Sequence, residues 1–269
     1  MAITARDFSQ LVERVAPLSC AYHWDNSGMT LYQHDEIKRV YLCLDVNADA
    51  IAEAEERGCD TILSHHPLLF SAIKKLCADE PVDELLLKAV RLGLNLYAAH
   101  TSYDCAPGGM NEWLAAQLGL AVPKPLIVQQ TAQDGSMLSG IGMIGLCETV
   151  LEPEELAQKV KQALNLPVVR VAKGKRKIQK VACVGGAGGD FLKAASDAGA
   201  DAFLTGEIKH NFYAEAAVLG LTLIEAGHYD TEKIFIRAMS EGLQKAQNEL
   251  KCNIEVICPR ECRRPYEFF

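Results

Sequence analysis

The sequence has 269 residues, which allows one large domain or two modest ones. Hydrophobic residues make up 49% and charged residues 23%, the balance of an ordinary globular protein. The formal net charge of −8 argues against a general nucleic-acid binder, because such a protein needs a basic surface to displace counterions. It does not exclude a small anionic substrate held by a metal ion. No apolar run approaches the roughly eighteen residues of a membrane span, and the N-terminal stretch lacks the apolar region of a secretory signal.

The ten cysteines are scattered singly along the chain. The closest pair, Cys258 and Cys262, has no partner pair that would complete a structural zinc site. Cys43, Cys147 and Cys183 lie in apolar, strand-like runs, where a reduced thiol behaves as a small hydrophobic group. We therefore expect buried, reduced thiols and a cytoplasmic location.

Short apolar runs alternate with helical patterns, an order typical of βαβ units around a mostly parallel sheet. In the first half we predict helices at 5–15, 48–57, 82–92 and 111–118, and strands at 39–45, 61–64 and 95–99. The second half opens with an extended segment at 126–130 and a polar turn at Asp134-Gly135-Ser136. It continues with strands at 139–147, 168–171, 180–184, 202–205, 222–225 and 253–257, and helices at 153–164, 191–198, 212–219 and 232–250.

An internal repeat links the two halves. The segment EAEERGCDTILSHHP aligns with KAASDAGADAFLTGEIKH, and LGLNLYAAHTSYD aligns with LGLTLIEAGHYDT. The matches are short, so chance is the alternative, but the order of strands and helices agrees in both halves. We therefore predict an α/β fold of two similar lobes, residues 1–128 and 129–269, each with a mostly parallel or mixed sheet.

Five of the seven histidines follow predicted strands, at the sheet edge where open α/β sheets bind their ligands. These histidines are His65, His66, His100, His210 and His228. Two carboxylates accompany them, Asp104 four residues after His100 and Glu232 four residues after His228. Each has a structural alternative. The His65-His66 pair would cap its strand as a polar turn, Asp104 would occupy a turn, and Glu232 would favour the macrodipole in the first turn of a helix.

Three imidazoles and two carboxylates suit Zn, Mn, Fe, Co or Ni better than a cysteine-based zinc site or an all-oxygen calcium site. Five protein ligands exceed the three of a typical catalytic zinc ion and fit two ions that share a carboxylate. We predict that Glu232 bridges the ions, that His66 and Asp104 complete one, and that His65 and His228 complete the other. His100 could be a ligand, a hydrogen-bond donor behind the ligands or a substrate contact.

A glycine-rich loop at residues 184–191 (VGGAGGDF) joins a predicted strand to a helix. Such a loop can cradle phosphate on its backbone N–H groups, or it can allow a helix to pack closely on a strand, and the sequence leaves both purposes open. It lacks the third glycine of the dinucleotide fingerprint and the lysine of a P-loop. Glu207 adds another carboxylate near the same edge.

At these residues the sequence resembles the Nif-three-like dinuclear-metal proteins, also labelled GTP cyclohydrolase 1 type 2 homologues. The resemblance spans nearly the whole chain. Its motifs are Trp24-Asp25-Asn26-Ser27-Gly28, Ser64-His65-His66-Pro67-Leu68, His100-Thr101 with Asp104, Gly185-Gly186-Ala187-Gly188, Thr205-Gly206-Glu207, and Gly227-His228-Tyr229 with Thr231-Glu232.

The resemblance implies that His65, His66, Asp104, His228 and Glu232 bind two divalent metal ions between two α/β lobes, with His100 beside them. It also implies a ring-like homohexamer. The region after Glu207 varies within the family, so His210 receives no role.

Two functions of different classes follow. In a metal-dependent hydrolase the two cations would acidify a water that attacks an electrophilic carbon or phosphorus of a small molecule, with His100 or Glu207 carrying protons. Applied to GTP, as the family label suggests, attack at the purine C8 would open the imidazole ring. The alternative is a metal-binding regulatory or metal-handling protein without turnover.

Overall fold

The computed structural model describes residues 2–131 and 137–268, and the turn predicted at Asp134-Gly135-Ser136 lies outside them. The chain divides into two compact units. Unit 1 comprises Met1–Ala106 and Phe235–Cys262, and unit 2 comprises Pro107–Ile234 and Arg263–Phe269. The bounds predicted for the two lobes, 1–128 and 129–269, stay a prediction. No helix in the described part of the chain is long and apolar enough to cross a membrane.

Unit 1 is built on a five-stranded sheet that is parallel except at one edge. Its strand order is β13 (Glu255–Ile257), β4 (Arg39–Cys43), β5 (Thr61–Ser64), β6 (Asn95–Ala98) and the antiparallel β2 (Gly28–Leu31). Two short strands, β1 (Ile3–Thr4) and β3 (Glu36–Ile37), pair separately. The other elements are α1 (Ala5–Glu13), η1 (Leu18–Cys20), α2 (Ala48–Glu56), α3 (Pro81–Arg91), α4 (Thr101–Asp104) and α10 (Phe235–Leu250).

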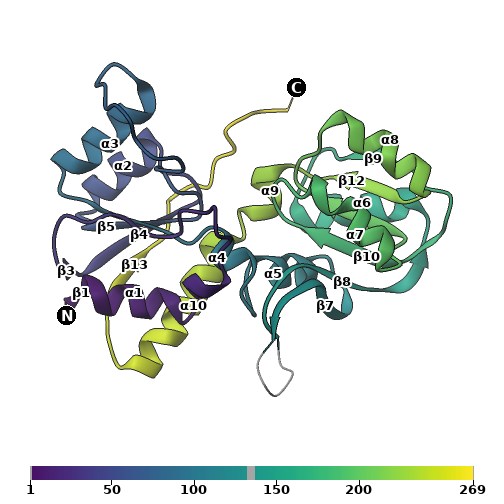
Figure 1. Cartoon of the computed structure of the whole chain (residues 1–269), viewed down its shortest axis with the longest axis horizontal. Helices are drawn as coiled ribbons and strands as arrows, with labels where there is room; N and C mark the ends of the chain where they lie inside the picture. Colours follow the sequence, from purple (N-terminus) through teal and green to yellow (C-terminus); the bar gives the residue numbers. More distant parts are fainter. Residues whose placement is uncertain (1, 132–136, 269) are drawn as a thin grey trace. The chain divides into compact units, whose positions relative to one another are not determined.

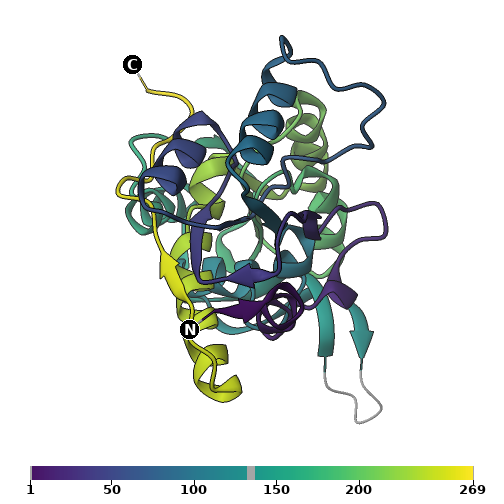
Figure 2. The same ribbon diagram turned by 90° about the vertical axis from the view of Figure 1, so that its left-hand side faces the viewer.

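Helices cover both faces of this sheet, which explains why its strands read as continuous apolar runs. Figure 1 shows α2 and α3 on one side of β4 and β5, and α1 and α10 on the other. Tyr41 and Cys43 of β4 belong to the core beneath α2 and α3, together with Ile51 of α2. On the opposite face, Phe8 of α1 meets Tyr97 of β6 edge-on, with 5.6 Å between ring centroids. Figure 2 shows α10 next to α1 on that side.

Unit 2 contains a six-stranded mixed sheet. Its order is β7 (Ala121–Thr131), β8 (Met137–Leu151), β10 (Ile178–Val184), β11 (Ala202–Thr205), β12 (Thr222–Glu225) and β9 (Arg170–Ala172), with β10, β11 and β12 parallel. Its helices are α5 (Met110–Gln117), α6 (Pro153–Leu164), η2 (Gly189–Phe191), α7 (Leu192–Asp197), α8 (His210–Leu219) and α9 (His228–Glu232).

Alternate side chains of the central strands in unit 2 pack in two separate cores, because successive residues of a strand point to opposite faces of the sheet. Cys183 and Leu204 point towards the core that includes Leu114 of α5 and Val160 of α6. Ala182 and Phe203, their neighbours in the chain, belong to the core that includes residues of α7 and α8.

The structure confirms the internal repeat in its hydrogen bonds. Asp60 accepts hydrogen bonds through Oδ2 from the N–H groups of Lys38 and Arg39, at 2.8 and 3.0 Å. Asp201, its counterpart in the alignment, accepts them from Gln179 and Lys180, at 3.1 and 2.9 Å. Each aspartate thereby fixes the start of the first strand of a parallel β-β-β set, β4-β5-β6 in unit 1 and β10-β11-β12 in unit 2.

The α/β fold of two similar lobes is therefore confirmed, although several elements differ from the prediction. The predicted helix at 232–250 is two helices, because α9 ends at Glu232 and α10 begins at Phe235. The prediction also missed β1, β2, β3 and α4, which have two to four residues each and are too short to show a period.

Candidate metal centre

Three imidazoles come together at the strand ends of unit 1. His65 and His66 follow β5, and His100 follows β6, the neighbouring parallel strand. One ring nitrogen from each lies within 4.8 Å of those of the other two. His65 is fully buried, whereas the side chains of His66 and His100 keep 25% and 16% of their surface exposed. The group is thus open on one side, as a ligand site needs to be.

A hydrogen bond orients each of these rings through Nδ1. His65 Nδ1 lies 2.9 Å from the carbonyl oxygen of Ala99, His66 Nδ1 lies 2.8 Å from Asp45 Oδ1, and His100 Nδ1 lies 2.7 Å from Asp25 Oδ1. A carbonyl or carboxylate oxygen can only accept, so each Nδ1 carries a proton, and in the neutral form of such a ring the lone pair lies on Nε2. Metal-binding histidines are commonly held in this way.

Asp25 anchors the site from beneath. Its side chain is fully buried and accepts hydrogen bonds from His100, from Ser27 Oγ at 2.6 Å, and from the backbone and hydroxyl of Thr101 at 3.1 and 2.6 Å. Burial would raise the pKa of Asp25, but the hydrogen bonds from His100, Ser27 and Thr101 outweigh it and hold the pKa well below its usual range. Asp25 is therefore an anion that fixes the orientation of His100.

Asp104 adds an oxygen donor to unit 1. It ends α4, a single helical turn that begins directly after His100, and its Oδ1 lies 3.7 Å from Nε2 of His65. The i, i+4 spacing suggested a carboxylate next to the His100 imidazole, and the contact found in the structure is with His65.

The donors of unit 2 follow β12. His228 begins α9 and Glu232 ends it, with His228 Nε2 3.0 Å from Glu232 Oε2. His228 Nδ1 lies 3.2 Å from Glu207 Oε2, so carboxylates lie on both sides of the ring. Because Glu232 ends the short α9 and does not begin the long helix, the macrodipole explanation for Glu232 is wrong. Its side chain is only 5% exposed.

The glycine loop is shaped to fit these donors. A Cβ atom built on Gly186, which has φ +60°, would lie 2.1 Å from Glu232 Oε1 and 3.2 Å from His228 Nε2. The N–H groups of Gly185, Gly186 and Gly188 donate to Asn111 Oδ1, Thr231 Oγ1 and Thr205 Oγ1, at 3.0, 3.0 and 2.9 Å. Of the two purposes that the sequence left open, these contacts support close packing, because the N–H groups that would bind a phosphate already have protein acceptors.

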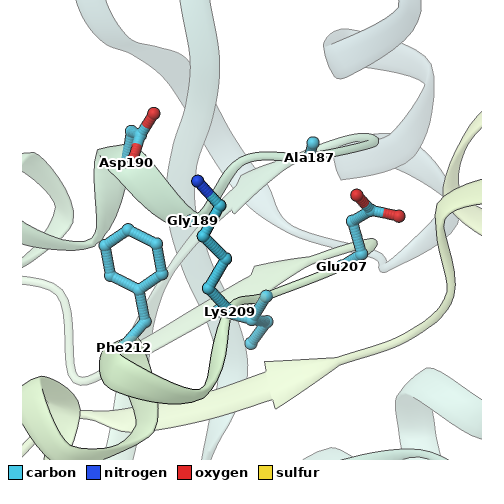
Figure 3. Close-up of a pocket in the computed structure, with 7 residues that line it drawn as sticks. Ala187, Gly189, Asp190, Glu207, Lys209 and Phe212 are labelled. Atoms are coloured by element: carbon cyan, nitrogen blue, oxygen red, sulfur yellow. The ribbon is translucent and has the colours of Figure 1, made fainter.

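A pocket of about 340 Å³ opens in unit 2 beside the same loop. Glu207 lies in its wall, and so links the pocket to His228. Figure 3 shows the Lys209 side chain extended between the Phe212 ring and Glu207. The remaining lining residues are Ala187, Gly189, Asp190 and Ile208.

The donor chemistry fits divalent transition metals. Unit 1 holds three grouped imidazoles, and each unit has a carboxylate beside an imidazole. No cysteine belongs to the candidate ligand groups found among the described residues, which fits the expectation of mixed nitrogen and oxygen donors. Six of the ten cysteines are buried, including Cys43, Cys147 and Cys183, for which burial was expected.

A family model described as Duf34/NIF3 (NGG1p interacting factor 3) matches residues 3–265. The chain belongs to this family. Among its NIF3 relatives, a Clostridium perfringens protein named GTP cyclohydrolase 1 type 2 homolog is 30% identical over 264 residues, covering 97% of this chain and 98% of its own length. A hypothetical protein of Staphylococcus aureus has a crystal structure with a TM-score of 0.92 and 29% identity, and each chain covers 100% of the other. The structure of reduced HcgD from Methanocaldococcus jannaschii matches with a TM-score of 0.75 and 28% identity. The match covers 96% of this chain and 98% of that one.

In this NIF3 chain the prediction placed the histidines at the strand ends but missed the carboxylates that orient them. Asp25 stands in the early W-D-N-S-G motif, and Asp45 follows β4 as the last residue of the predicted strand 39–45. An acidic residue at the end of a predicted apolar strand was the available signal for Asp45. His210 begins α8 as an exposed residue and belongs to neither candidate ligand group.

Proposed function

We propose that this protein is a metal-dependent hydrolase acting on a small molecule, and that His65, His66, Asp104, His228 and Glu232 bind two divalent metal ions. The observation that carries the proposal is the set of three imidazoles with their Nδ1 protons committed to oxygen acceptors. One ring nitrogen from each of His65, His66 and His100 lies within 4.8 Å of those of the other two, so the three rings can address one site. The alternative, a polar turn that caps a strand, does not require three oriented rings.

Divalent cations bound there would acidify a water and polarise the electrophilic atom of a substrate. Of the protein groups, His100 is suited to carry a proton, because Asp25 holds its ring from behind and part of the ring is exposed. Glu207 is the second candidate, since it is 60% exposed in the wall of the pocket and contacts His228. Lys209, in the same wall, offers a positive charge to an anionic substrate.

GTP is the first substrate to test, because curated relatives carry the name GTP cyclohydrolase 1 type 2 homolog. Hydrolysis at the purine C8 would open the imidazole ring and change the ultraviolet spectrum of the base. Simple phosphoesters form the second class to test, since two-cation sites also cleave them.

The decisive experiment measures metal content and turnover together. Protein loaded with Mn, Zn, Fe, Co or Ni is expected to bind two equivalents and to turn over a member of the substrate panel. His66→Ala and Glu232→Gln should abolish that turnover, while His210→Ala serves as a control histidine outside the proposed ligand set. Metal-replete protein that is inert towards the whole panel would overturn the hydrolase and favour a metal-binding regulatory or metal-handling role.

Ligand identity is tested separately. A double variant, His65→Ala with His228→Ala, should lose both metal equivalents, and retention of metal would show that the ligand set is wrong. Homohexamer formation in a cytoplasmic protein is a further part of the proposal, and the mass of the particle in solution tests it.

A further inference from the structure

Two large aromatic side chains stand exposed beside the imidazoles of unit 1. Trp24 is 52% exposed and Phe70 is 53% exposed. Their rings lie 6.0 Å apart, and each lies close to His100, at 6.4 Å for Trp24 and 6.2 Å for Phe70, measured between centroids. We call this surface, formed by Trp24 and Phe70, the aromatic wall.

Hydrogen bonds hold the wall in place although its rings are exposed. On one side of Trp24, the N–H of Tyr22 donates to Thr101 Oγ1 at 3.0 Å. On the other side, Asp25 is bound to His100 and Thr101. Asn26 Nδ2 donates to the carbonyl of Leu69, which ties the loop of Trp24 to the residue before Phe70. The wall is thus anchored to the segment that carries His100.

The exposure of these rings calls for an explanation, because a half-exposed tryptophan forgoes much of the free energy that burial of its large surface would supply. Tyr22 stacks on one face of Trp24, at 5.2 Å and 17° between planes, which stiffens the indole and still leaves half of it in water. A rigid, exposed aromatic surface next to reactive side chains is typical of a binding surface.

We propose that the aromatic wall binds the planar heteroaromatic ring of the substrate, so that the groups at the edge of that ring reach His100. The wall is made of rings and is continuous with the imidazole group, through the contacts of His100 with His65 and His66 at 5.2 and 5.4 Å. A ring stacked on the aromatic wall would therefore lie next to the imidazoles of the proposed reaction site.

A cationic ligand held by the same rings is the competing idea. The carboxylate of this loop, Asp25, is fully buried and accepts hydrogen bonds from His100, Ser27 and Thr101, so it does not face a ligand on the wall. A planar neutral ring needs no such counter-charge, and stacking suits it better.

The test measures the binding of guanosine to the intact chain, with tryptophan fluorescence as the readout. The chain contains two tryptophans, so Trp113→Phe leaves Trp24 as the sole reporter. We expect guanosine to quench Trp24, and ribose, which lacks the ring, to leave it unchanged. The inference rests on the proposed function, because it takes the bound ring to be part of the substrate. Guanosine binding is measured without metal or turnover, so loss of the hydrolase proposal and loss of the binding proposal give different results.

Variants then locate the binding surface, with affinity measured by calorimetry. Trp24→Leu and Phe70→Leu should each weaken guanosine binding about tenfold, in line with the stacking of one base on an aromatic side chain. Trp24→Phe should retain most of the affinity, because it keeps a ring. Tyr32→Leu is the matched control, since Tyr32 is an aromatic residue of the same unit with 59% exposure and lies outside the wall.

Four results would overturn the inference. The first is binding of ribose as tight as that of guanosine, and the second is unchanged guanosine affinity in both leucine variants. The third is stronger quenching of Trp24 by choline than by guanosine. The fourth is a smaller particle in solution for Trp24→Leu that still binds guanosine with normal affinity. The last result would mean that a second copy of the chain covers the wall.

Discussion

The contact between the glycine loop and Glu232 yields the sharpest test of the proposed metal site. We predict that Gly186→Ala strongly weakens metal binding and only modestly destabilises the fold. A Cβ on Gly186 would lie 2.1 Å from Glu232 Oε1, whereas ordinary van der Waals contact begins near 3.4 Å. The carboxylate must therefore retreat by about 1.3 Å, the difference between these two distances. Metal–ligand distances tolerate only about 0.2 Å.

Two free-energy contributions are involved, and they affect different measurements. Gly186 has φ +60°, and forcing alanine into this conformation costs about 1–2 kcal/mol of folding stability, or a few degrees of melting temperature. Displacement of the carboxylate adds little to this cost in the metal-free protein, because the clashing atom is the end of a flexible side chain. In the metal-bound protein the same displacement removes a ligand, and we expect affinity to fall by about 10- to 100-fold or more.

Gly220→Ala separates the two contributions. Gly220 lies in the same unit with φ +68°, and a Cβ there would meet nothing within 4 Å. Both variants should lose similar stability without metal, by differential scanning fluorimetry. Only Gly186→Ala should lose metal affinity, by calorimetric titration with Mn or Zn. Wild-type affinity in Gly186→Ala, or an equal loss in Gly220→Ala, would refute the assignment of Glu232 as a ligand.

Three further predictions follow from the same contacts. Asp25→Asn should lower the free energy of unfolding by about 2–3 kcal/mol, because an amide cannot accept all the hydrogen bonds that the buried carboxylate receives. Since the folded pKa of Asp25 lies below its usual value near 3.8, this stability is complete above about pH 4 and is lost as the pH falls below it, so melting temperatures of wild type and variant should converge in acid. Thr205→Val should cost about 1–3 kcal/mol by chemical denaturation, as it removes the acceptor of Gly188 N–H and the donor to Gly186 C=O, and no loss would contradict that role. A chelator should lower the melting temperature, and metal at 100 times its Kd should restore about 2.7 kcal/mol; an unchanged transition would argue against bound metal.

Much of the fold was predictable because the helices and strands carry strong periodic signals and repeat. The glycines of the repeated turns have positive φ in both units, +62° at Gly58 and +75° at Gly199. Each is followed two residues later by the aspartate that caps the neighbouring strand. A short sequence match thus reflected a real structural constraint, since a residue with a Cβ is strained in that turn and a longer or uncharged side chain would not cap the strand.

The site was only partly predictable, for a physical reason. A strand-end histidine can be located by its position after an apolar run, but the atom that orients it comes from elsewhere in the chain. Asp25 lies 75 residues from His100, and Asp45 lies 21 residues from His66. No local pattern encodes such distant pairs. The break between α9 and α10 was missed for a different reason, because the residues around Glu232 continue a helical pattern.

The repeat also explains why the two units contribute different donors from equivalent positions. His65 and Glu207 follow the middle strand of each parallel set, and His100 and His228 follow the third strand. The backbone framework is the same, so the difference lies in the side chains: unit 1 places three imidazoles together, and unit 2 places carboxylates on both sides of one. Neutral imidazoles supply directed lone pairs without charge, whereas carboxylates supply the negative charge that offsets divalent cations. If two cations bind as proposed, loss of an imidazole ligand from unit 1 should reduce affinity most for metals that favour nitrogen donors, and loss of Glu232 should reduce affinity for every divalent metal tested.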